Sequence, residues 1–134
     1  MTKEEINLFS NNFKFESAIA KAEFDLLPEL LSPDETLLAL IEGTICGNYR
    51  DIAGKGLLFA TNRRVVFFRK SFIGTNTFEE IFLSSITAIS FDKGLLTDGS
   101  ISITTDRQRL IIERCNNSLA ERTVNVIMNS LIMS

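Results

Sequence analysis

The spacing of apolar and polar residues divides the 134-residue chain into a helical start, a run of strands and a helical end. Thr2 and Glu5 fit a capping box, in which each side chain binds the backbone N–H of the other residue at the start of a helix. Residues 15–27 contain no glycine, and their apolar residues recur near helical spacing until Pro28 ends or kinks the helix. We therefore expect residues 1–35 to form an N-terminal helical appendage.

From Thr36 onward, short apolar runs alternate with turn residues, a pattern typical of closely spaced β-strands. The runs 56–61 and 64–70 are rich in β-branched and aromatic residues and meet at the hinge Thr61-Asn-Arg63, which predicts a β-hairpin. About seven strands are expected in all, which indicates a small barrel or sandwich. Their predicted ranges are 37–45, 56–61, 64–70, 77–83, 86–92, 100–104 and 109–115.

The last segment predicts an amphipathic helix that begins at a capping box formed by Ser118 and Glu121. One stripe of this helix is apolar and consists of Ala120, Val124, Ile127, Met128 and Leu131. Such a stripe has to cover an apolar surface, and the open mouth of a barrel is the surface we expect. Residues 36–134 are therefore predicted to form one barrel domain with a C-terminal helix.

The residues of the hairpin and the following strands match a known pattern. The chain carries Gly56-Leu-Leu, then Thr61-Asn-Arg-Arg64, then Glu80-Ile-Phe-Leu-Ser-Ser-Ile-Thr-Ala-Ile89. Over residues 36–132 this order resembles the bacterial pleckstrin-homology-like domains of the YokE-like type. Two departures are an Arg-Arg pair at residues 63–64, where Lys-Arg is commoner, and Phe82, where proline is usual. The resemblance implies an α+β fold, a pleckstrin-homology-like seven-stranded bent β-barrel with a C-terminal capping helix.

Composition and charge exclude several classes of protein. The net charge of −3 argues against a nucleic-acid partner. No apolar run approaches the about 20 residues of a membrane-spanning helix, and the acidic start of the chain does not fit a signal peptide. Cys46 and Cys115 lie far apart in the sequence and are expected to be buried, reduced thiols. These features predict a cytoplasmic protein.

The sequence offers little to an enzyme. It contains no histidine, which excludes Ser-His-Asp and Cys-His nucleophile systems and histidine-based zinc sites. The Gly54-Lys-Gly56 run is too short for a phosphate-binding loop. Asp51, Glu79 and Glu80 suggest a pair of carboxylates, but charged residues beside strand ends are usually solvated. We therefore expect no catalytic residue, no metal ligand and no cofactor.

Basic residues are the main candidates for a binding site. In an antiparallel barrel, four of them fall at the end where the first two strands and the third and fourth strands are connected. They are Arg50, Lys55, Arg69 and Lys70. Eukaryotic pleckstrin-homology domains bind inositol phosphates at this end, but the chain lacks their basic signature. Two interpretations stay open: a solvated rim, or a weak site for anionic lipid or phosphate. Arg63 and Arg64 lie at the opposite end.

A protein partner is favoured by the strand Val65-Val-Phe-Phe68, which is apolar on both of its faces. The N-terminal helices, a second subunit or another protein has to cover its outer face. We therefore expect a non-catalytic binding or adaptor module of the bacterial cytoplasm, acting in protein–protein interaction or self-association. The alternative is a peripheral membrane module that binds anionic lipid headgroups.

Overall fold

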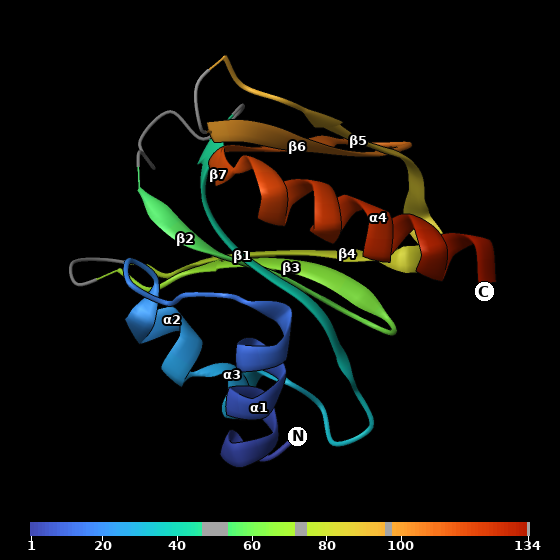
Figure 1. The fold of residues 1–134 in the computed structure, drawn as a ribbon. Helices are drawn as coiled ribbons and strands as arrows, with labels where there is room; N and C mark the ends of the chain where they lie inside the picture. The colour runs from blue at the N-terminus through green and yellow to red at the C-terminus, as the bar shows by residue number, and fades with distance from the viewer. Residues whose placement is uncertain (47–53, 72–74, 96–97, 134) are drawn as a thin grey trace.

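The computed structural model describes residues 1–46, 54–71, 75–95 and 98–133 of the chain. Within these ranges, seven antiparallel strands form one sheet in the order β4-β3-β2-β1-β7-β6-β5. They are β1 (Leu37–Cys46), β2 (Lys55–Thr61), β3 (Arg64–Arg69), β4 (Thr77–Phe82), β5 (Ile86–Asp92), β6 (Asp98–Thr105) and β7 (Arg109–Asn116). The sheet bends into a half-barrel with β4 and β5 at its two ends (Figure 1). The predicted α+β fold with seven strands is confirmed.

The C-terminal helix α4 (Asn117–Met133) packs on β1, β5, β6 and β7 and fills the opening of the half-barrel (Figure 1). Ala120, Val124 and Ile127 of the predicted apolar stripe are buried, whereas Met128 is exposed. The predicted capping residue is wrong, because the helix begins earlier. The side chain of Asn116, rather than that of Ser118, accepts a hydrogen bond from the backbone N–H of Leu119 at 3.0 Å.

The N-terminal segment forms three helices, α1 (Lys3–Phe13), α2 (Lys21–Asp25) and α3 (Leu27–Leu30). The capping box of Thr2 and Glu5 is confirmed. The single helix predicted over residues 15–27 is wrong, because a carboxylate of the sheet sets the start of α2. Glu42 on β1 accepts hydrogen bonds from the backbone N–H groups of Ile19 and Ala20, both at 3.2 Å.

These helices cover the outer face of β1, β2 and β3, opposite α4 (Figure 1). Both faces of the hairpin are buried: Leu57 and Phe59 on one face and Leu58 on the other are all 0% exposed. The apolar side chains of the N-terminal segment belong to the same core as the strands, and they include Ile6, Phe13, Phe15, Phe24, Leu27 and Leu31. The sequence left three possibilities for what covers the outer face of Val65–Phe68. In the structure, the N-terminal helices of the same chain cover it. The division at residue 36 stays a prediction.

Among the described residues, no helix has both the length and the apolar character required to cross a bilayer.

Candidate functional site

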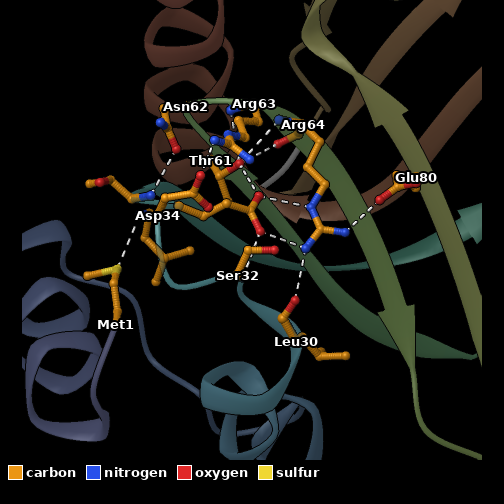
Figure 2. Close-up of polar contacts among 12 residues, drawn as sticks. Met1, Leu30, Ser32, Asp34, Thr61, Asn62, Arg63, Arg64 and Glu80 are labelled. Atoms are coloured by element: carbon orange, nitrogen blue, oxygen red, sulfur yellow. Dashed lines mark hydrogen bonds and ion pairs between the residues drawn. The ribbon is translucent and has the colours of Figure 1, made fainter.

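The turn of the hairpin is held by a polar network around Arg64, the first residue of β3 (Figure 2). The Arg64 guanidinium binds the Glu35 carboxylate through two hydrogen bonds, from Nε to Oε2 at 2.9 Å and from Nη2 to Oε1 at 2.7 Å. The same carboxylate accepts hydrogen bonds from the Thr61 hydroxyl at 2.7 Å and from the Ser32 backbone N–H at 2.9 Å. A buried carboxylate with this many donors is fully compensated.

The protonation of Glu35 follows from these contacts. Burial on its own raises the pKa of this carboxyl group. The hydrogen bonds from Arg64, Ser32 and Thr61 and the positive charge of Arg64 outweigh burial and lower the pKa from 4.5 to about 2. Glu35 is therefore ionised under ordinary conditions, and its role is to hold the N-terminal segment to the hairpin.

Arg64 also reaches the neighbouring strand. Its Nη1 donates to Oε2 of Glu80 on β4 at 2.5 Å, and its Nη2 donates to the Leu30 carbonyl at 2.8 Å. Two carboxylates thus share one guanidinium, which leaves one surplus negative charge. The Glu35 side chain is 1% exposed and the Glu80 side chain is 33% exposed, so the surplus charge lies toward solvent at Glu80.

Residues 61–63 complete the attachment of the turn. The backbone N–H of Asn62 donates to the Thr36 carbonyl at 3.2 Å, and the Asn62 side-chain oxygen accepts a hydrogen bond from the Thr36 N–H at 2.9 Å. Arg63 pairs with Asp34 in an exposed ion pair. The sequence places Arg63 and Arg64 at the hairpin tip, as observed, but does not reveal the role of Arg64. Its partner Glu35 is 29 residues away, and no local spacing signals that contact.

Strand β4 forms one end of the sheet and offers an open edge. It pairs with β3 over its whole length, and no strand in the described part of the chain pairs with its other side. Thr77 and Ile81 point inward and are buried, whereas Phe78 and Phe82 are 44% and 53% exposed. The ring of Phe78 also packs edge-on against Phe68, with 6.3 Å between centroids.

A groove adjoins the end of β4. Its volume is about 480 Å³, which is in the range of ligand-binding clefts. The groove lies between the end of β4 and the turn that joins β6 and β7, and Phe82, Ser85, Thr87, Arg107 and Gln108 are among its lining residues. The exposed edge of β4 therefore runs into a hollow of the surface.

The predicted basic site lies at the opposite end of the hairpin. Lys55 begins β2, Arg69 ends β3 and Lys70 follows it, so these three residues share one end of the sheet; Arg50 lies outside the described residues. The Arg69 guanidinium lies against Gly54, in space that a larger residue there would fill. Lys70 is exposed, and its backbone N–H donates to the buried carboxylate of Glu23 on α2 at 2.8 Å.

Lys55 also lines a cavity of about 400 Å³, which Arg69 and Lys70 do not line. Charged residues of both signs surround this cavity: the basic residues Lys14, Lys55 and Arg114, and the acidic residues Glu16, Glu42 and Asp98. Lys14 and Arg114 have left-handed backbone angles, with φ of 65° and 58°. Lys14 is the C-cap residue that follows α1, and Arg114 lies beside a register shift in the pairing of β6 with β7. Among the described residues that line the cavity, the three positive and three negative groups balance.

The two cysteines carry protonated thiols. Burial, followed by the negative charge of Asp98, raises the pKa of Cys115 to about 12. Burial, followed by the nearby Glu113, raises the pKa of Cys46 to about 11. Cys115 is buried as predicted, and Cys46 is half-buried. A thiol with a raised pKa is a poor nucleophile.

Comparison with known proteins gives a family and a fold. The family model described as bacterial PH domain matches residues 31–129, whereas a search of curated proteins finds no match. A C-terminal domain of an unknown protein from Leishmania infantum is 18% identical with a TM-score of 0.59, covering 81% of this chain and 93% of that one. The Vps36 N-terminal PH domain is 14% identical with a TM-score of 0.57, covering 76% and 86%. A pleckstrin homology domain from Shewanella amazonensis is 15% identical with a TM-score of 0.52, covering 85% and 98%.

Proposed function

Because the chain belongs to the bacterial PH domain family, we propose that it is a non-catalytic binding module of the bacterial cytoplasm that recognises protein partners or further copies of itself. The narrower YokE-like type is part of the same proposal. The observation that carries it is the open edge of β4 with its two exposed phenylalanine side chains, Phe78 and Phe82.

An open strand edge is a binding surface for another extended chain. Its unpaired backbone N–H and C=O groups form hydrogen bonds with an added strand, and its side chains provide specificity. Phe78 and Phe82 alternate with Glu80 on the outward face of β4, so an added strand meets an apolar, an acidic and an apolar position in turn. The N-terminal helices cover the outer face of the neighbouring strands, whereas Phe78 and Phe82 of β4 stay exposed to a partner.

Photo-crosslinking tests this proposal. The photoreactive residue p-benzoylphenylalanine replaces Phe82 in one variant and Leu8 in another, since Leu8 on α1 is also exposed, at 63%. In cells where the chain naturally occurs, we expect protein adducts from position 82 and none from position 8. An adduct of twice the chain mass identifies self-association. Absence of adducts at position 82, or the same adducts from both positions, would contradict the proposal.

The second candidate function is binding to an anionic membrane surface. It is supported by the shared location of Lys55, Arg69 and Lys70 at one end of the sheet, and Arg50 is included in this candidate from the sequence. Two observations weaken it: the described residues that line the cavity with Lys55 include three acidic ones, and the net charge of the chain is −3. Each basic residue near an anionic surface contributes about 1 kcal/mol.

Co-sedimentation with vesicles tests this second function. Vesicles of neutral and of anionic lipids are compared at low and high salt, with the wild-type chain, Lys70→Glu and the control Lys3→Glu. Membrane binding predicts sedimentation with anionic vesicles alone, lost at high salt and in Lys70→Glu but kept in Lys3→Glu. Equal binding by both variants places the contact elsewhere, and absence of binding removes this function.

A further inference from the structure

The geometry points to a partner of β4 with a definite chemistry: an extended segment of a different protein that carries a basic residue between two apolar ones, at positions i−2, i and i+2. This inference rests on the proposed function, because it assumes that the edge of β4 binds a protein strand. It goes further by naming what the strand carries and by giving a reason why β4 of a second copy is disfavoured as that strand.

The apolar positions follow from the alternation of β4. Phe78, Glu80 and Phe82 point outward on the same face, and the residues of an added strand that lie opposite them also share one face. Phe78 and Phe82 remain 44% and 53% exposed in the folded chain. Apolar residues opposite these two rings bury that surface, since cross-strand pairs of an aromatic and a β-branched or aromatic residue stabilise a sheet.

The basic position follows from the charge count of the Arg64 network. Arg64 gives two hydrogen bonds to Glu35 and one to Glu80, so one positive charge serves two carboxylates. Glu35 has additional donors in Thr61 and Ser32, whereas Glu80 lies at the solvent side of the network. A carboxylate accepts several hydrogen bonds, so Glu80 still offers acceptor sites to a lysine or arginine opposite it.

The same charges disfavour pairing between two copies of β4. A two-fold axis perpendicular to the sheet keeps the faces of two antiparallel β4 strands aligned. Of the two most nearly complete registers of this kind, one places Glu80 opposite Glu80 of the second copy and the other places Glu80 opposite Phe78. Like charges that lie directly opposite each other destabilise strand pairing. A strand with a basic residue at this position avoids the repulsion.

The groove beyond Phe82 gives such a segment room to continue. It follows the end of β4 toward Thr87 on β5 and Arg107 in the turn between β6 and β7. A segment longer than the six residues of β4 therefore leaves the edge and enters this hollow. Octapeptides are long enough to sample both the edge and the groove.

A selection with a phage-displayed library of random octapeptides tests the inference. The immobilised proteins are the wild-type chain, the double variant Phe78→Ser/Phe82→Ser and the single variant Glu80→Gln, each checked for native circular dichroism. From the wild type we expect peptides with lysine or arginine flanked two residues away on each side by apolar residues. Their affinity should fall about twofold to fivefold when an isosteric neutral residue replaces the basic one.

The variants separate the inference from the proposed function. Selection on Glu80→Gln should keep the apolar positions and lose the basic preference, and the double phenylalanine variant should select no such peptides. Wild-type peptides without a basic preference, or a preference that persists on Glu80→Gln, would overturn the inference and leave the proposed function standing. Failure of the wild type to select any peptide, or identical peptides on the double phenylalanine variant, would remove the β4 edge as a binding surface.

Discussion

The two ends of the β2–β3 hairpin both carry basic residues, but the chain uses them in opposite ways. At the turn, the Arg64 side chain is 12% exposed and is bound by Glu35 and Glu80. At the other end, Lys70 is exposed, and no ion pair joins Lys55, Arg69 or Lys70 to a residue that the structure describes. The difference arises because residues 30–36 lie over the turn.

This difference shows what decides the role of a charged residue. A charge covered by another segment requires a compensating partner, because an unpaired buried charge is costly. A charge in water requires none and contributes little to stability. The turn of the hairpin is thus a structural joint between the N-terminal segment and the sheet, whereas the described basic residues at the opposite end form no such joint.

Removal of the guanidinium at the turn should have the largest effect. Arg64→Met leaves Glu35 buried without its main partner, and we expect the free energy of unfolding to fall by about 3–5 kcal/mol. Arg63→Met is the matched control, since Arg63 makes an exposed ion pair with Asp34; its loss should be about 1 kcal/mol or less. Urea unfolding followed by circular dichroism measures both values.

A double variant sharpens this comparison. Glu35→Gln removes the charge that Arg64→Met leaves unpaired, so the combined variant should recover part of the stability lost in Arg64→Met. If Arg63→Met and Arg64→Met destabilised the chain equally, or if the double variant showed simple additivity, Arg64 would not be a buried structural partner of Glu35.

Acid should weaken the same joint. The pKa of Glu35 is lowered from 4.5 to about 2, so the folded chain binds this proton less tightly than the unfolded chain does. The contribution of Glu35 is therefore complete above about pH 4.5 and is lost as the pH falls toward 2; it amounts to about 3 kcal/mol. Urea unfolding at several pH values measures how the free energy of unfolding changes with pH. Between pH 4.5 and 2, this change should be smaller in Glu35→Gln than in the wild type.

Two glycines at the opposite end test how rigid that end is. A Cβ at Gly56 would lie 2.6 Å from the Phe68 carbonyl oxygen, which belongs to the paired backbone of β3. Gly56→Ala should therefore cost about 1–3 kcal/mol. The three atoms nearest to a Cβ at Gly54 belong to the flexible Arg69 side chain, which can turn away, so Gly54→Ala should change stability by about 0.5 kcal/mol or less. If thermal unfolding showed that Gly54→Ala and Gly56→Ala lose the same amount of stability, the Arg69 side chain would be held as firmly as the backbone.

The strands and the hairpin could be predicted because their signals are local. Alternation, turn residues and β-branched runs act over a few neighbouring positions, as in the hinge Thr61-Asn-Arg63. The helix boundaries were harder, because contacts distant in sequence determine them. Glu42 lies 22 residues from Ala20, yet its carboxylate binds the N–H that precedes α2. Ser10 is polar, yet it is buried in α1 and donates its hydroxyl to the Phe15 carbonyl at 3.2 Å.

The candidate site could be predicted only in part, for a similar reason. Strand order alone places Lys55, Arg69 and Lys70 at one end of the sheet. The Arg64 network combines residues from three separate segments, and the open edge of β4 depends on the order of all seven strands. Sequence patterns reveal neither the Arg64 network nor the open edge, since both depend on which segments become neighbours after folding.

The smallest effect is expected at Lys70. Its side chain is exposed, and the contact that involves this residue is made by its backbone N–H, which donates to Glu23. Lys70→Gln keeps that N–H, so the free energy of unfolding should stay within about 0.5 kcal/mol of the wild type. A loss above about 1 kcal/mol would show that the side chain stabilises the fold. If the stability is unchanged, weaker binding of Lys70→Gln to anionic vesicles is due to the lost positive charge. This variant therefore tests the membrane alternative directly.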